Sequence, residues 1–294
     1  MNSLLFLMYS HHNEISLPGS GLNFFTELFH HQDLQYGLII AIFIGLLAGI
    51  VGSFSIMHGM SLLSDSLSHA VFPGIVLSII LGVPMIIGAG VFGAIAILFI
   101  NLIRSRTKLN TDTAIGIIYP TFFAIGMILV AKNNLGDLSE EILFGDIFSI
   151  TPQDLLMIVI VGLFVLFFIF TQYKKLQLLV FDENFAKQAN VNVSLLETAL
   201  TICLALVIII SLKAVGVILV TALLIIPAST AYLWSNSFKK MILISAIVGM
   251  LSAIFGFIIS YQINIPSGPA IVLTSFVFFV ASFIFKNLVS NKAN

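Results

Sequence analysis

The sequence predicts an all-α protein that crosses a membrane many times, and two observations support this. First, 59% of the 294 residues are hydrophobic, only 9% are charged, and the mean hydropathy is +1.14. A soluble domain carries about 25% charged residues, so this chain cannot build a water-facing surface. Second, continuous apolar runs recur between Gly37 and Phe285, each near the roughly 20 residues that cross about 30 Å of hydrocarbon as a helix. Membrane-spanning strands would alternate in polarity instead, so we expect a helical bundle in a lipid bilayer.

We expect nine apolar spans between a polar arm and a short tail. The spans cover residues 37–57, 60–81, 83–103, 114–131, 154–170, 196–212, 214–234, 241–260 and 269–285. Very short gaps separate the first span from the second and the sixth from the seventh, so some helices could be broken or re-entrant, and eight full crossings is the alternative. The chain then divides into an extracytoplasmic N-terminal arm (1–36), a transmembrane domain (37–285) and a cytoplasmic C-terminal tail (286–294).

The basic residues predict the orientation of the chain, because Lys and Arg near membrane spans stay on the cytoplasmic side. In the nine-span arrangement, ten of the 12 basic residues fall on one side. These ten are Arg104, Arg106, Lys108, Lys174, Lys175, Lys187, Lys239, Lys240, Lys286 and Lys292. Only Lys132 and Lys213 fall on the other side. We therefore expect an external N-terminus and a cytoplasmic C-terminus.

Local signals mark several helices. Thr151 is a predicted N-cap, and Ser194 with Glu197 has the spacing of a capping box. Pro227 should kink its helix, and the carbonyl that it leaves unbonded should be met by Thr221 or a neighbouring helix.

Glycines inside the apolar spans predict close helix packing. Gly45, Gly49 and Gly52 recur on one helix, and small residues at such positions let helix backbones approach. Residues 88–93 (GAGVFG) match a dinucleotide-binding pattern literally. Because no strand precedes them, we interpret them as helix packing as well.

One polar stripe interrupts the second span. Asp65 and His69 are the only acid and histidine well inside a predicted span, and their spacing puts them on one helical face about 6 Å apart along the axis. Ser61, Ser64 and Ser68 share that side as helpers. A carboxylate at mid-membrane costs roughly 2.5–3.5 kcal/mol on insertion scales, so it normally faces a partner group or a water-filled path.

A carboxylate and an imidazole at this spacing suit a divalent cation such as zinc, manganese or ferrous iron. Two protein ligands bind weakly, which a permeation pathway needs because the ion must leave again. The residues alone leave an alternative of equal weight, in which Asp65 and His69 form an interhelical hydrogen-bonded pair that serves only packing. No permanently bound cofactor is expected, and the metal would be the substrate.

The N-terminal arm carries two His-His pairs. His11, His12, His30 and His31 could capture metal on the outer face, but no acid or cysteine completes a ligand set of fixed spacing. A solvated arm is therefore favoured for the histidines. Residues 22–36 could lie in the membrane interface as an amphipathic helix, and a solvated, partly disordered arm is an alternative of about equal weight.

A short polar segment on the predicted cytoplasmic side is typical of a docking element. Asp182 can cap a helix that runs through Glu183, Phe185, Ala186 and Ala189. This helix is too polar to cross the membrane, and an ordinary ordered loop is the alternative.

Motifs that are missing from the sequence exclude other functions. No GxxxxGK[ST] loop occurs, so the chain does not bind ATP in the P-loop manner. No HExxH or GxSxG occurs, which argues against an intramembrane protease. A stand-alone secondary cation transporter is the alternative to an ATP-driven one, although it would usually carry several intramembrane acids.

Five stretches resemble the permease subunits of zinc, manganese and iron ABC importers. They are residues 58–74 (HGMSLLSDSLSHAVFPG), 111–116 (TDTAIG), 142–154 (ILFGDIFSITPQD), 217–230 (VILVTALLIIPAST) and 265–272 (IPSGPAIV). They follow the order of that family across the hydrophobic region.

The resemblance implies a bundle like the vitamin-B12 (type II) ABC importers in a bacterial inner membrane. It implies a pair of permeases, a homodimer being expected, with cytoplasmic ABC ATPases, an extracytoplasmic metal-binding protein and no nucleic-acid partner. In that family an aspartate and a histidine of the second helix contact the metal, and they match Asp65 and His69. The ATPase-docking segment matches residues 182–191.

Overall fold

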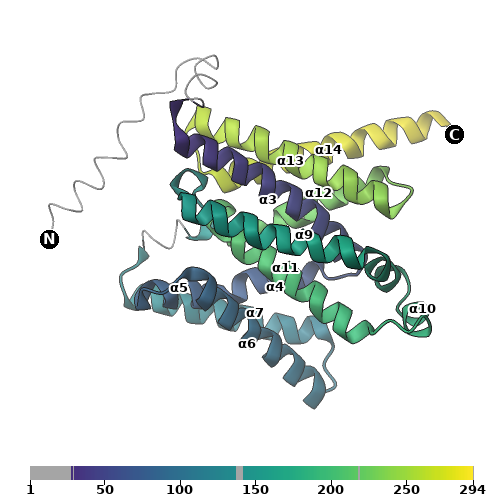
Figure 1. The fold of residues 1–294 in the computed structure, drawn as a ribbon, viewed down its shortest axis with the longest axis horizontal. Helices are drawn as coiled ribbons and strands as arrows, with labels where there is room; N and C mark the ends of the chain where they lie inside the picture. Colours follow the sequence, from purple (N-terminus) through teal and green to yellow (C-terminus); the bar gives the residue numbers. More distant parts are fainter. Residues whose placement is uncertain (1–27, 29, 137–141, 218, 294) are drawn as a thin grey trace.

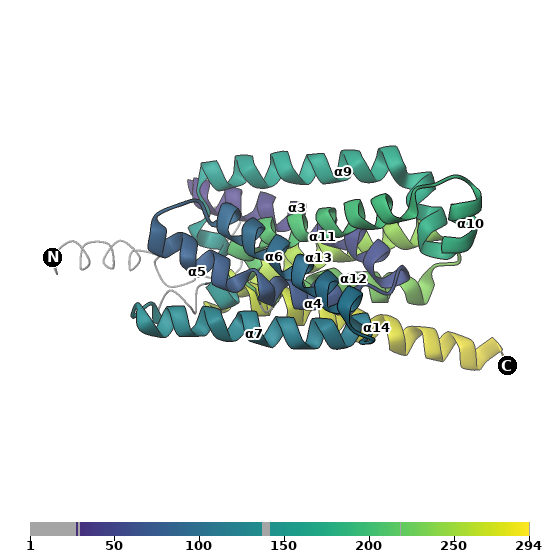
Figure 2. The ribbon, with the colours of Figure 1, turned by 90° about the horizontal axis from the view of Figure 1, so that it is seen from below.

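The computed structural model describes residues 28, 30–136, 142–217 and 219–293, and within these residues it contains helices and no strand. The helices are α3 (Gln32–Met57), α4 (Ser61–Ala70), α5 (Phe72–Leu81), α6 (Met85–Arg106), α7 (Thr111–Lys132), the 3-10 helix η2 (Ile147–Ser149), α9 (Pro152–Phe181), α10 (Glu183–Gln188), α11 (Val193–Val215), α12 (Val220–Trp234), α13 (Phe238–Ile263) and α14 (Ser267–Ala293). The long helices run roughly side by side from one end of the molecule to the other (Figures 1 and 2).

Eight helical segments of the described chain are long and apolar enough to cross a membrane, and α4 with α5 counts as one of them. The predicted seventh span, 214–234, is wrong at its start, because α11 continues to Val215 and α12 begins at Val220. Helix α12 has only 15 residues, or about 22 Å at 1.5 Å per residue. Of the predicted interfacial helix at 22–36, residues 22–27 and 29 lie outside the described residues, and the last five residues belong to α3.

Most basic residues lie at one end of the bundle. Helix α3 begins at one end and α14 finishes at the other (Figure 1). The ten basic residues expected on one side lie in or next to the α6–α7, α9–α11 and α12–α13 connections and at the end of α14, all at the end where the C-terminus lies. The arrangement has the asymmetry of basic residues from which the orientation is predicted, and the orientation itself stays a prediction.

Helix α3 packs so closely against two neighbours that only glycine fits at the crossings. A Cβ atom on Gly45 would collide with the backbone of Gly249 in α13, and one on Gly49 would collide with that of Ser245. The Ser245 hydroxyl also donates a 2.7 Å hydrogen bond to the Gly49 carbonyl. A Cβ on Gly52 would meet the Leu224 carbonyl in α12. The predicted small-residue packing of α3 is thereby confirmed.

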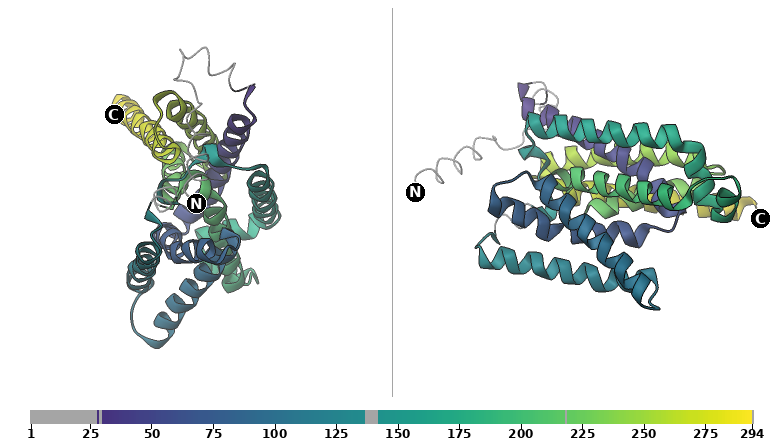
Figure 3. Two further views of the ribbon diagram at one scale, coloured as in Figure 1. Left: turned by 90° about the vertical axis from the view of Figure 1, so that its left-hand side faces the viewer. Right: turned by 60° about the horizontal axis from the view of Figure 1, so that its bottom comes forward.

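The literal dinucleotide pattern at residues 88–93 lies in the first half of α6, as the packing interpretation predicts. Gly88 meets the backbone of Gly74 in α5, while Gly90 faces open space. Helices α4 to α7 form a group on one side of the molecule, which Figure 3 shows both along the bundle and from its end.

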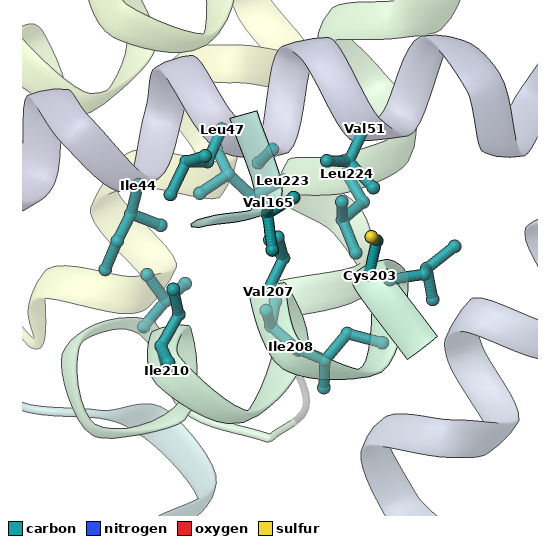
Figure 4. Packing of buried hydrophobic residues seen from close by; sticks show 14 of the residues in the cluster. Ile44, Leu47, Val51, Val165, Cys203, Val207, Ile208, Ile210, Leu223 and Leu224 are labelled. Carbon is teal, nitrogen blue, oxygen red and sulfur yellow. The ribbon is translucent and has the colours of Figure 1, made fainter. Parts of the chain in front are cut away.

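Apolar side chains from α3 and three neighbouring helices pack together in the core. Figure 4 shows the labelled members of this cluster from α3, α9, α11 and α12. They are Ile44, Leu47, Val51, Val165, Cys203, Val207, Ile208, Ile210, Leu223 and Leu224. By contrast, the outer side of α9 exposes large apolar side chains such as Phe164, Phe167 and Phe170. An apolar core under an equally apolar surface fits a protein that is solvated by lipid.

Residues 142–146 and the α11–α12 connection meet in one junction at the end of the bundle opposite the C-terminus. Asp146 N–H donates to the Lys213 carbonyl at 3.0 Å, and Val217 N–H donates to the Ile142 carbonyl at 3.1 Å. Gly216, with φ +86° and ψ 161°, lets the chain leave α11 here, because this region of backbone angles suits glycine almost alone. The junction therefore fixes where α12 starts.

Helix caps confirm one prediction and correct another. Thr151 caps α9, as predicted, and Asp154 completes a capping box with it. Ser194 does not cap α11, because Asn192 occupies that position and accepts a hydrogen bond from the Leu195 N–H. The Asp154 carboxylate also pairs with Lys213 at 2.6 Å, which ties the start of α9 to the end of α11.

We predict that Gly45→Val destabilises the protein, because the added side chain would overlap the α13 backbone. The expected loss is about 1–3 kcal/mol, typical of overpacking a tight core, and it would appear as a lower midpoint of thermal unfolding in detergent. Gly90→Val is the matched control, since nothing lies within 4 Å of a Cβ there. Equal unfolding midpoints for the two variants would contradict the crossing described above.

Candidate functional site

The polar stripe lies on a separate short helix. The second span is broken at Val71 into α4 and α5, and α5 has a proline, Pro73, in its first turn. Proline has no N–H to continue the helical ladder, which gives the break a local cause. Helix α4 contacts α3, α6, α7, α11 and α12, so it lies within the bundle.

Asp65 and His69 face each other across one turn of α4. Their Oδ1 and Nε2 atoms are 4.0 Å apart, which is beyond hydrogen-bond distance. The Asp65 side chain is 47% exposed and the His69 side chain only 11%. The imidazole packs against the rings of Tyr119 and Phe123 in α7, with centroids 4.5 and 5.4 Å away. The Asp65 carboxylate is therefore half exposed, whereas the His69 imidazole beside it is enclosed by aromatic rings.

A third polar side chain reaches the pair from α12. The Thr221 hydroxyl donates a 3.2 Å hydrogen bond to Asp65 Oδ1. Of the two partners expected for the carbonyl freed by Pro227, Thr221 is wrong, since its hydroxyl donates to Asp65 of α4 instead. Sequence reasoning missed this contact, although Thr221 is a polar residue in one of the family-like stretches.

Two of the three predicted helper serines are turned away from any opening. Ser64 is fully buried, and its hydroxyl bonds Ser55 of α3 at 2.8 Å and the Met60 carbonyl at 3.0 Å. Ser68 is also fully buried and donates to the Asp65 carbonyl at 2.8 Å. Their geometry is that of packing residues, because each hydroxyl is bonded inside the chain. Ser61 is partly exposed and is the member of the trio that fits the helper prediction.

The pair offers a metal ion few ligands. Two ligand atoms on a tetrahedral zinc lie about 3.4 Å apart, given bonds of about 2.0–2.1 Å, so the 4.0 Å separation needs only a small closure. No group of three or more His, Cys, Asp or Glu side chains that could hold a metal occurs in the described part of the chain. The arrangement can therefore contact a passing cation but is too sparse to trap one.

The N-terminal histidines, for which a solvated arm is favoured over metal capture, lie partly outside the described residues. His30 and His31 are exposed where α3 begins, and His11 and His12 lie outside the described residues. Whether the arm binds metal stays a prediction.

The predicted short helix exists as α10. The Asp182 carboxylate caps it by accepting a hydrogen bond from the Phe185 N–H at 3.0 Å, as expected. Lys187 bonds Glu183 at 2.6 Å on the exposed side, and this hydrogen bond lowers the pKa of the Glu183 carboxyl. Ala186 is fully buried, so it anchors the helix to the bundle rather than presenting a surface.

An open groove runs beside α10 at the end of the bundle that carries the basic residues. Lys174, Gln177, Leu178, Phe181, Asp182 and Phe185 line it. Phe181 and Phe185 are 58% and 54% exposed. The predicted docking residues thus divide between a buried anchor, Ala186, and exposed positions that include Phe185, Asp182, Glu183 and Ala189.

Known proteins resemble the whole of this bundle. The chain is 45% identical to the manganese import system permease protein ScaB of Streptococcus parasanguinis over 260 residues, which is 88% of this chain and 93% of that protein. It is 33% identical to the chelated iron transport system membrane protein YfeD of Yersinia pestis over 263 residues, which is 90% of this chain and 89% of that protein.

Among solved structures, PsaBC from Streptococcus pneumoniae in complex with Fab matches with a TM-score of 0.84 and 40% identity, over 89% of this chain and 95% of that chain. The model of the ABC 3 transport family matches residues 30–286. These matches confirm the fold class and the resemblance found in the sequence. The chain belongs to the ABC 3 transport family, as a metal-type ABC transporter permease.

Proposed function

We propose that this chain is the membrane-spanning subunit of an ATP-driven importer that moves a divalent metal ion, namely zinc, manganese or iron, into the cell. Asp65 and His69 contact the ion as it passes. This proposal rests on one observation. A half-exposed carboxylate lies beside an imidazole inside a candidate membrane span. Relatives named for manganese import and chelated iron transport support manganese and iron among these ions.

The exposure of Asp65 favours a pathway over a packing role. A pair that served packing alone would be buried and hydrogen-bonded, yet the two side chains lie 4.0 Å apart and that of Asp65 is 47% exposed. A carboxylate facing lipid at mid-membrane would cost roughly 2.5–3.5 kcal/mol on insertion scales. Its open side therefore belongs to a water-filled path or a second permease subunit.

The proposal assigns a partner to each end of the bundle. A cytoplasmic ABC ATPase docks in the groove beside α10, and an extracytoplasmic metal-binding protein delivers the ion at the other end. A second copy of the permease completes the pathway. In this arrangement the N-terminus is external and the C-terminus is cytoplasmic. Family membership disfavours the alternative of a stand-alone secondary transporter.

We predict that Asp65→Asn and His69→Ala each reduce metal uptake by at least about tenfold, since losing even an outer contact of a metal site commonly costs that much. Uptake of Mn²⁺, Zn²⁺ and Fe²⁺ by cells expressing equal amounts of each variant is the measurement. Asp112→Asn is the matched control, because this acid lies in the first turn of α7, away from the pair. Normal uptake of all three ions by both site variants would refute the assignment.

We predict that Phe185→Asp weakens ATPase association by at least about tenfold, as expected when an aromatic anchor of an interface is lost. Titration of the purified permease with the ATPase in lipid nanodiscs measures this. Leu109→Asp serves as the control, since Leu109 is also an exposed apolar residue, 42% exposed, on the separate α6–α7 connection. A Phe185→Asp complex as tight and active as the control would remove the docking assignment.

A further inference from the structure

The contact between α12 and the Asp65 carboxylate is the strongest feature that the proposed pathway leaves unexplained. The Oδ1 atom of this carboxylate makes both contacts described above. It lies 3.2 Å from the Thr221 hydroxyl and 4.0 Å from His69 Nε2. A carboxylate has two oxygens and about four acceptor positions. Oδ1 can therefore accept the hydroxyl hydrogen while the group still offers a charged oxygen to a cation.

We propose that Thr221 is a positioning residue that fixes the rotation of the Asp65 carboxylate, and thereby sets how strongly the pathway binds its metal ion. The inference rests on the metal-contacting role proposed for Asp65. Thr221 itself would not need to touch the ion.

The position of Thr221 in its helix explains why its hydroxyl is available. A threonine inside a helix commonly bonds the carbonyl four residues earlier, and Thr230 of the same helix does so with Ile226 at 2.8 Å. Thr221 lies in the first turn of α12, so the residue four positions earlier, Val217, is outside the helix. Its hydroxyl points to Asp65 instead, while the residue as a whole is only 5% exposed.

Burial makes this hydrogen bond effective. Water competes poorly for the hydroxyl of a residue that is only 5% exposed, and a hydrogen bond to a charged acceptor is stronger than one between neutral groups. The bond restricts the Asp65 side chain, which is about half exposed and would otherwise change its rotamer freely. A fixed carboxylate loses less conformational freedom when it binds an ion.

The bond also links metal affinity to the packing of two helices. Asp65 belongs to α4, whereas Thr221 belongs to α12, which starts just after Gly216 in the junction of connections. A shift of α12 relative to α4 would lengthen the Thr221–Asp65 distance and release the carboxylate. The site would then hold its ion tightly in one arrangement of α12 and loosely in another, as a transporter needs.

The test compares Thr221→Val, Thr221→Ser and Thr230→Val in the complete transporter, reconstituted in liposomes and normalised to assembled complex, with Mn²⁺ as the first ion. Thr221→Val keeps the shape and removes the hydroxyl, and it should raise the apparent KM for Mn²⁺ about tenfold with little change in maximal rate, which matches one hydrogen bond to a charged group. Thr221→Ser restores a hydroxyl and should keep the KM near that of the parent protein. Thr230→Val removes an equally buried hydroxyl that does not reach Asp65, and it should leave the KM unchanged.

Two results would overturn the inference. One is a KM for Thr221→Val equal to that of Thr230→Val. The other is an equal rise for Thr221→Ser, which would assign the effect to packing of the threonine methyl group. The Asp65→Asn variant distinguishes failure of the metal-contacting role of Asp65 from failure of the positioning role of Thr221. If it transports normally, the metal role of Asp65 fails, whereas loss of transport in Asp65→Asn with a normal KM in Thr221→Val removes only the positioning role.

Discussion

The close backbone contact between α3 and its neighbours α13 and α12 is the constraint on which the rest of the bundle depends. In a bilayer, apolar helices gain little from meeting each other because lipid is equally apolar, so association relies on tight packing and interhelical hydrogen bonds. Helix α3 uses both, with Gly45 and Gly49 against α13 and a Ser245 hydroxyl on its backbone. The Gly52–Leu224 crossing then fixes α12 beside α3, and this position lets α12 extend a hydroxyl to the α4 carboxylate.

The candidate site follows from what a membrane does to polar groups. Buried hydroxyls near it are bonded inside the chain, as Ser64 is to Ser55, because an unbonded polar group in an apolar medium is expensive. Asp65 is different, since one hydrogen bond satisfies only part of its capacity and its side chain stays 47% exposed. A carboxylate that is fixed on one side and open on the other can meet a cation briefly, whereas a closed cage of ligands would retain it.

The groove beside α10 and the candidate site are joined by a continuous set of contacts. Phe181 lines the groove and packs on Phe238 at the start of α13, with ring centroids 5.7 Å apart. Phe238 in turn packs on Phe54 of α3 at 4.9 Å, and the next residue, Ser55, bonds Ser64 one position before Asp65. These contacts lead from the groove through the core to α4.

The sequence alone determined the membrane class, the glycine packing of α3, the α10 cap at Asp182 and the placement of Asp65 and His69 on one helical face, because these depend on composition or on residues a few positions apart. It also carried the family resemblance. Only the tertiary structure decided that α12 is short, that Ala186 is an anchor, that Ser64 and Ser68 face inward and that Lys213 pairs with Asp154. The Thr221 hydrogen bond joins residues 156 positions apart. Such a contact depends on how α12 packs against α4, which no local spacing in the chain encodes.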